Sequence, residues 1–238
     1  MRPVRNSILV AALLCTAIPA LAQPAAAPEA VPEAASGRQD RQAVRTRQFM
    51  IVTANPHASR AGDEILRAGG SALDAAIAAQ MVLNLTEPQS SGIGGGAFLM
   101  HWDGAHKRLR SYDGRETAPA AARPDRFLGP DGKPLSFAEA VESGKSVGVP
   151  GVLRMLKLAH ERHGRLPWAR LFQPAIRLAE NGFAVSQRLH ALVAGDPALP
   201  RNAAARAYFY DAQGRALPVG RLLKNSEFAA TLRRIARR

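Results

Sequence analysis

The chain has 238 residues, and 47% of them are hydrophobic, which is enough for one domain with a sizeable core. Its 32 Lys and Arg residues outnumber its 19 Asp and Glu residues and give a formal net charge of +13. A charge of this size is typical of some nucleic-acid-binding proteins. However, the arginines are scattered through periodic segments, except in the terminal "RRIARR", and no nucleic-acid-binding module is recognisable. The sequence therefore predicts no nucleic-acid partner.

Residues 1–22 have the pattern of a secretory signal peptide. Arg2 and Arg5 supply the positive charge, "ILVAALLCTAI" is an apolar stretch, and "ALA" before Gln23 is a small-residue cleavage site. About eleven apolar residues are too few to span a bilayer, so we predict cleavage after Ala22 rather than a membrane anchor. The expected location is periplasmic or secreted.

Cleavage would also remove Cys15, the only cysteine, and lower the net charge to +11 through the loss of Arg2 and Arg5. The mature protein would then have neither a disulfide nor thiolate chemistry. A lipoprotein is the less consistent interpretation of Cys15, because Leu14 stands where a small residue is expected.

Residues 23–46 are rich in Ala, Pro and charge and lack hydrophobic periodicity, so they predict a disordered tether. The remaining segment, 47–238, is predicted to be globular. It opens with a short apolar strand at 49–53. No internal repeat is recognisable.

Two helices are expected next. The first covers about 57–68 and ends at Gly69. The second begins at Ser71, and Asp74 three residues later completes the pattern of a capping box. Because "AAIAAQMVLNL" is apolar on nearly every face, this helix is expected to be buried, and it should end at Glu87.

The glycine-rich stretch "QSSGIGGGAF" at 89–98 contains the dinucleotide-binding pattern G-x-G-x-x-G/A. A dinucleotide site requires a strand, a glycine turn and a helix in that order, whereas here a helix precedes the loop and a strand follows it. No Gly-Lys-Ser/Thr follows either, which excludes a P-loop. The glycines are therefore predicted to let the chain pass tightly between a buried helix and a strand.

The alternation of Phe98, Met100 and Trp102 predicts a strand, and "HKRLRSYD" at 106–113 completes a hairpin. Loops are expected at 120–146 and 190–224. Apolar spacing predicts helices in three further segments, which are 152 to Gly164, 168 to Gly182 with a restart at Pro174, and a last helix capped by Ser226. The last helix has no closing signal, so a truncated domain is expected.

Four blocks resemble the N-terminal half of gamma-glutamyltransferases. They are "AGGSALDAAIAAQMVLNLTEPQSSGIGGGAF", "YDGRETAPAAA", "VGVPGV" and "HGRLPWARLFQPAIRLAENGFAVS". Their order and spacing match, and the resemblance covers about residues 49–238. One departure is Ser71, where the family usually has Asn, and both residues are good N-caps.

The resemblance implies an α/β (α+β) fold, namely a partial αββα sandwich of the N-terminal-nucleophile hydrolase type. The family is made as one precursor that cuts itself into a large and a small subunit. The small subunit's new N-terminal Thr attacks the γ-glutamyl amide, with its own α-amine as base. The resemblance implies no cofactor and no metal ion, and it implies glutathione as substrate and a small-subunit half as partner.

The nucleophile is absent from this chain, because none of its six threonines is followed two residues later by His. The resemblance therefore assigns no catalytic residue here and one substrate-binding residue, Arg115, which matches the family arginine that grips the glutamyl α-carboxylate. Guanidinium groups pair bidentately with carboxylates. Asp113 and Glu116 either orient this guanidinium or are solvated loop carboxylates.

Other candidates have weaker patterns. His160 and His163 are three residues apart on a predicted helix, but no third metal ligand has matching spacing. A role at the helix end, where His complements the helix dipole, is therefore favoured over a metal site. His57 has no other candidate ligand with matching spacing. Glu87 lacks the partner carboxylate that a catalytic acid would need, so it is expected to have a structural role at the end of the helix.

Three hypotheses about the function stay open. The first is the N-terminal part of an exported gamma-glutamyltransferase, which is enzymatic only within the complete protein. Within the same fold family, a beta-lactam acylase or a poly-gamma-glutamate depolymerase fits equally. The third hypothesis is an inactive truncated product or a non-catalytic binding module.

Overall fold

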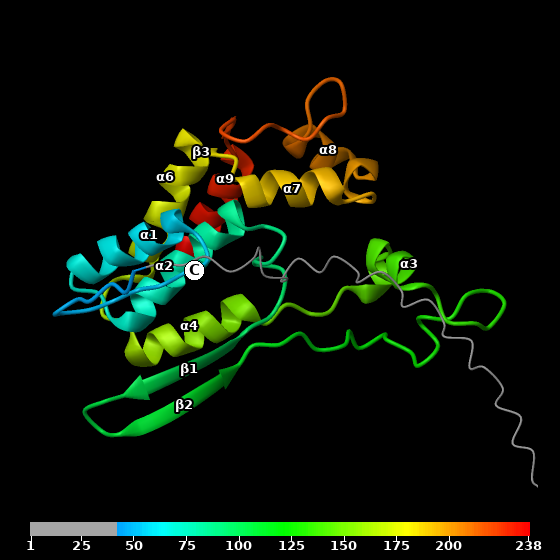
Figure 1. Ribbon diagram of the computed structural model, residues 1–238. Helices are drawn as coiled ribbons and strands as arrows, with labels where there is room; N and C mark the ends of the chain where they lie inside the picture. The colour runs from blue at the N-terminus through cyan, green and yellow to red at the C-terminus, as the bar shows by residue number, and fades with distance from the viewer. Residues whose placement is uncertain (1–41) are drawn as a thin grey trace, which may run out of the picture. The chain divides into compact units, whose positions relative to one another are not determined.

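The computed structural model describes residues 42–238. The predicted signal peptide, 1–22, and most of the predicted tether, 23–46, lie outside the described residues. The helices of the described part, shown in Figure 1, are α1 (Pro56–Arg67), α2 (Ala72–Thr86), α3 (Phe137–Glu142), α4 (Val152–His163), α5 (Trp168–Leu171), α6 (Gln173–Asn181), α7 (Gln187–Gly195), α8 (Ala203–Phe209) and α9 (Ser226–Ala236). The strands are β1 (Phe98–Asp103), β2 (Arg108–Asp113), β3 (Phe183–Ala184) and β4 (Leu222–Leu223). Within residues 42–238, none of the helices is both long and apolar enough to cross a membrane.

Helix α2 lies at the centre of the core and contacts α1, α4, α5 and α6. Its side chains are apolar on nearly all sides, and Ile77, Ala78 and Met81 are completely buried. The predicted capping box is present: the Asp74 N–H donates to Ser71 Oγ at 3.1 Å, and the Ser71 N–H donates to the Asp74 carboxylate at 2.9 Å. The predictions of a buried helix and of its cap are both confirmed.

Asp74 also connects α2 to the segment that follows α4. Its carboxylate is 0% exposed, and Oδ2 accepts the backbone N–H groups of Arg165 at 2.9 Å and Leu166 at 3.1 Å. A residue that appears in the sequence as a local cap is therefore a buried tertiary anchor.

Strands β1 and β2 form the predicted antiparallel hairpin, which lies beside α4 in Figure 1. The buried Tyr112 lies on the face that packs against the helices. The alternating side chains of β1 lie on the other face, where Phe98 is 70%, Met100 70% and Trp102 60% exposed. The hairpin therefore leaves a large apolar face uncovered within the described part of the chain.

The segment 168–182 contains two helices, because α5 ends before Pro174 and α6 begins with that proline in its first turn. Gly182 ends α6 with a φ of +91°, which only glycine adopts easily. Helix α9 packs against both helices. These predictions are confirmed, but the cap of α9 is Asn225 rather than Ser226, since the Asn225 side chain accepts the Phe228 N–H at 2.8 Å.

Three local predictions are wrong. Residues 49–53 form no strand, because no neighbouring segment of the described chain pairs with them. The expected loop at 120–146 contains α3, and the expected loop at 190–224 contains α8 and most of α7. These helices have 6 to 9 residues, which is too short for apolar periodicity to stand out.

Candidate functional site

The glycine-rich stretch meets two other segments at one place. The carbonyl of Gly95 accepts the N–H groups of Gly151 and Val152, both at 3.2 Å, at the start of α4. Ala97 and Gly114 exchange two backbone hydrogen bonds of 3.3 and 2.9 Å. The stretch 89–98, the segment "DGRETAP" and the segment "VGVPGV" are thus joined through their backbones.

Gly96 explains why this junction needs glycine. A Cβ atom on Gly96 would lie 2.7 Å from the Arg115 Cα, from the Gly114 carbonyl oxygen and from Glu116 Oε2. Contacts this short are not found for real Cβ atoms, so the approach of the two backbones requires a residue without a side chain. The packing role predicted for the glycines is confirmed at Gly96, whereas a Cβ on Gly94 would meet nothing within 4 Å.

A cavity of about 510 Å³ opens at this junction. Its walls include Gly94, Arg115, Glu116, Arg126, Lys145 and Gly148. Three of these residues are cations and one is a carboxylate, so the cavity has an excess of positive charge. Such a cavity is suited to an anionic ligand.

Arg115 is placed by its two acidic neighbours in different ways. The Asp113 carboxylate accepts the Arg115 backbone N–H at 2.9 Å, so it fixes the main chain rather than the guanidinium. Glu116 Oε2 lies 3.4 Å from Arg115 Nη2, an ion pair longer than a good N–H···O bond. The Arg115 side chain is 57% exposed, which leaves guanidinium donors available to a ligand in the cavity.

The histidines lie in separate environments. His160 Nε2 lies 2.9 Å from the Leu166 carbonyl oxygen and 3.5 Å from Asp74 Oδ1, which places it in the buried anchor. His163 Nε2 lies 2.7 Å from the Tyr112 hydroxyl, and its ring stacks on another imidazole. His57 contacts Arg60, and burial, followed by the Arg60 charge, lowers the pKa of His57. Among residues 42–238, no group of three or more His, Cys, Asp or Glu side chains could hold a metal ion.

Glu87 is the C-cap of α2, as its predicted helix-end role requires, and it is also buried at 5% exposure. Its carboxylate accepts the side-chain N–H groups of Asn55 at 2.9 Å and Gln89 at 2.6 Å, and Arg188 Nε lies 3.5 Å away. This network joins the starts of α1 and α7 to the residues that lead into the glycine-rich stretch. The sequence did not reveal it, because the partners are far apart along the chain.

The fold is a partial α/β fold of the N-terminal-nucleophile hydrolase type, as predicted. Within residues 42–238 its strands form only two two-stranded sheets. The structure is similar to the crystal structure of Helicobacter pylori gamma-glutamyltranspeptidase, with a TM-score of 0.77 and 28% identity, over 82% of this chain and 56% of that one.

The chain belongs to the gamma-glutamyltranspeptidase family, whose model matches residues 58–238. It is 41% identical over 186 residues to the glutathione hydrolase proenzyme of Bacillus subtilis (strain 168), which covers 78% of this chain and 32% of that protein. It is 37% identical over 217 residues to the acylase ACY 1 proenzyme of Pseudomonas sp. (strain V22), covering 88% of this chain and 38% of that protein. The chain thus spans 32% to 38% of the length of these curated relatives.

Proposed function

We propose that this chain forms the donor-binding part of an exported gamma-glutamyltransferase that hydrolyses glutathione or transfers its γ-glutamyl group. The observation that carries the proposal is the position of Arg115. Its partly exposed guanidinium lies in the wall of the 510 Å³ cavity, and its main chain is fixed by Asp113. A planar guanidinium offers two parallel N–H groups to a carboxylate, which suits the α-carboxylate of a γ-glutamyl donor.

The acyl-transfer step uses a nucleophile from a second half of the protein. In our proposal, the N-terminal Thr of a small-subunit half attacks the γ-glutamyl amide, and the Thr α-amine takes the hydroxyl proton. The amine leaving group departs with a proton, and water or an amino acid then takes the glutamyl group from the acyl-enzyme. The exposed apolar face of the hairpin supports a partner half, because such a face is normally covered in a folded protein.

The arrangement in the whole protein follows the family pattern in this proposal. Residues 1–22 are a signal peptide, 23–46 are a tether, and 47–238 are the N-terminal part of the large subunit. The mature protein is periplasmic or secreted. The bacterial relative named above is a proenzyme, which supports a precursor that is later cut.

Substitution of Arg115 by Lys in the complete protein tests the proposal. A lysine keeps the positive charge but loses the bidentate pairing, which costs on the order of 1–3 kcal/mol, so the KM for a γ-glutamyl donor should rise roughly 5- to 150-fold. Arg110→Lys, on the exposed part of β2, is the matched control and should leave the KM unchanged. An unchanged KM in the Arg115 variant would reject the assignment.

The acylase relative supports a second candidate activity of the same fold, the removal of an acyl side chain, and the beta-lactam acylase that the sequence left open is one form of it. An acyl group without an α-carboxylate gives the Arg115 guanidinium no partner. Turnover of such a substrate should therefore be insensitive to Arg115→Lys, whereas turnover of a γ-glutamyl donor should fall. A complete protein that turns over neither substrate would favour the non-catalytic alternative.

A further inference from the structure

Two cavities adjoin at the proposed donor site. The first, of about 510 Å³, contains Arg115, and the second, of about 380 Å³, lies next to it. Both are lined by Pro119, Arg126 and Lys145, so these residues form the boundary that the two cavities share. A ligand longer than one amino acid can therefore occupy the first cavity and reach this boundary.

The charges on the cavity walls do not cancel. Arg115 faces Glu116 at 3.4 Å, and Arg123 faces Asp125 at 3.4 Å. In contrast, neither cation of the shared boundary, Arg126 nor Lys145, has a carboxylate within ion-pair distance among residues 42–238. The positive charge that remains without a partner is thus concentrated at the boundary.

Backbone contacts fix the segments that carry the two cations. Thr117 and Val149 exchange hydrogen bonds of 3.4 and 2.9 Å, which brings the segment after Lys145 alongside the segment after Arg115. The Arg126 N–H donates to the Arg123 carbonyl at 3.2 Å, and the half-buried Arg126 guanidinium lies 5.4 Å from the centre of the Phe127 ring. The two cations are therefore part of a folded wall.

We propose that Arg126 and Lys145 form a second carboxylate-binding position, which contacts an acidic group on the leaving-group side of the donor. The inference rests on the proposed function, since Arg115 supplies the first position. A γ-glutamyl donor whose leaving group ends in a carboxylate, as in glutathione, then binds through both of its ends. A donor with an uncharged leaving group binds only through Arg115.

Calorimetric binding of glutathione and of its C-terminal amide to the whole protein tests this inference, with a methylene group in place of the γ-amide nitrogen of each ligand so that the protein cannot cleave it. The two ligands differ only in the charge of the second end. We expect glutathione to bind about tenfold more tightly, and we expect R126Q/K145Q to abolish this preference without changing the affinity for the amide. Equal affinity of the two ligands for the unsubstituted protein, or a preference that survives in R126Q/K145Q, would overturn the inference.

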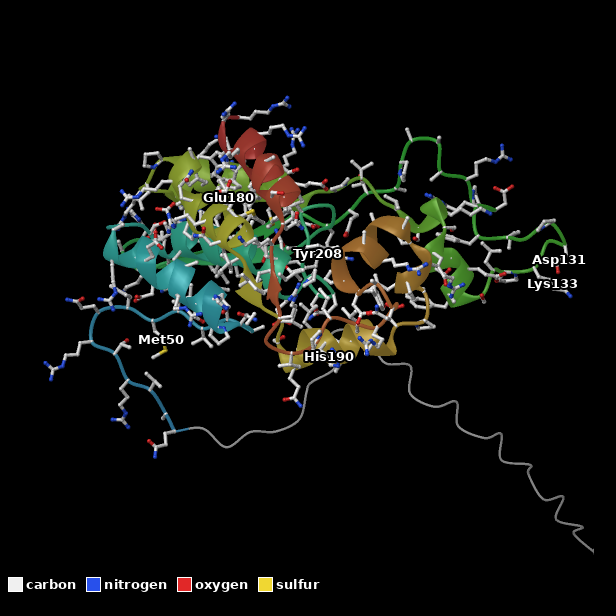
Figure 2. The ribbon with its side chains drawn as sticks, turned by 90° about the horizontal axis from the view of Figure 1, so that it is seen from above. Met50, Asp131, Lys133, Glu180, His190 and Tyr208 are labelled. Carbon is white, nitrogen blue, oxygen red and sulfur yellow. The ribbon has the colours of Figure 1, made fainter. Side chains whose placement is uncertain are left out.

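R108Q/K133Q is the matched control, because it removes the same two charges from exposed positions outside both cavities. Figure 2 shows Lys133 beside Asp131 at the tip of a loop, where the two side chains lie 3.8 Å apart. This control should keep the tenfold preference. If it loses the preference, the effect comes from net charge alone, and the local site is refuted.

The same ligands separate this inference from the proposed function. R115K should weaken both ligands by a similar factor and leave the preference intact. If the protein prefers the glutathione analogue but the complete protein releases no glutamate from glutathione itself, the carboxylate position stands and the proposed activity fails. If the complete protein hydrolyses glutathione and its amide but binds the two analogues equally, the activity stands and the carboxylate position fails.

Discussion

Substitution of Gly96 by Ala should destabilise the protein, because the new methyl group has no space. It would lie 2.7 Å from the Arg115 Cα and the Gly114 carbonyl oxygen, and both atoms belong to the main chain. A main chain cannot rotate aside as a flexible side chain can, so the junction must separate. Overpacking of this kind costs about 1–3 kcal/mol.

Gly94→Ala is the matched control for this prediction. A Cβ on Gly94 would meet nothing within 4 Å, and the φ of Gly94 is not in the left-handed region. The same chemical change should therefore be neutral or stabilise the protein by about 0.4–1 kcal/mol through the unfolded state. The difference between the two variants isolates the close approach at Gly96.

Urea unfolding of the complete protein measures the difference directly. At an m-value of about 2 kcal/mol/M, the midpoint of Gly96→Ala should lie roughly 0.5–2 M below that of Gly94→Ala. Gly96→Ala should also raise the KM of a γ-glutamyl donor, because separation of the junction moves Arg115. Equal midpoints for the two variants would refute the packing argument, since it depends only on the space at each glycine.

Three further predictions concern stability and solubility. Asp74→Ala should lower the free energy of unfolding by about 2–4 kcal/mol in the same urea assay, because buried N–H groups lose their acceptor. The control, Asp63→Ala, removes an exposed ion pair and should lower it by less than about 1 kcal/mol. Burial, followed by the His101 and Arg110 charges, lowers the pKa of His163. At His163 the folded protein therefore binds fewer protons than the unfolded chain as the pH falls through about 6.5 towards the lowered pKa. This residue should make stability fall on acidification over that window, and His163→Gln should reduce the fall. When it is produced alone, the chain should aggregate through the exposed apolar face of its hairpin. Trp102→Thr should then reduce the light scattering of the sample. A monomer that melts cooperatively would contradict this prediction.

The sequence predicted the elements whose side chains repeat over several turns. Helix α2 is apolar on nearly all sides, α4 and α9 have apolar stripes, and the β1–β2 hairpin has a clear alternation, so all four were found. Periodicity failed for α3, α7 and α8, although each begins with a side chain that caps it: Ser136, Ser186 and Asn202. A cap signals where a helix starts, but Ser and Asn occur equally in turns, so the cap alone did not identify these short helices.

The apolar segment 49–53 failed for a different reason. A strand needs a partner to satisfy its N–H and C=O groups, and a local pattern carries no information about whether that partner exists. The Thr53 hydroxyl instead donates to the Asn55 carbonyl at 2.7 Å, just before α1 begins. The tertiary structure, rather than β-propensity, decided the conformation of this segment.

The candidate site was predictable only in part. The order of helix, glycine-rich stretch and strand excluded a nucleotide loop, and the resemblance singled out Arg115. Arg126 and Lys145 gave no signal, because they lie in a segment without periodicity and the chain is rich in cations throughout.

What distinguishes these two cations is their environment. Some other cations have an ion-pair partner, as Arg177 has in Glu64 and Arg233 in Glu180. The other cations of residues 42–238 that have no such partner lie outside the two cavities. A charge that lies in a cavity wall without such a partner retains its full attraction for a ligand, because no internal pair has to be broken first. By the same argument, Arg115 should bind a ligand carboxylate less tightly than an unpaired arginine would, because the ligand must compete with the Glu116 carboxylate 3.4 Å away. Tight binding of a γ-glutamyl donor therefore benefits from a second cationic position, and Arg126 and Lys145, which line both cavities, supply it in our proposal.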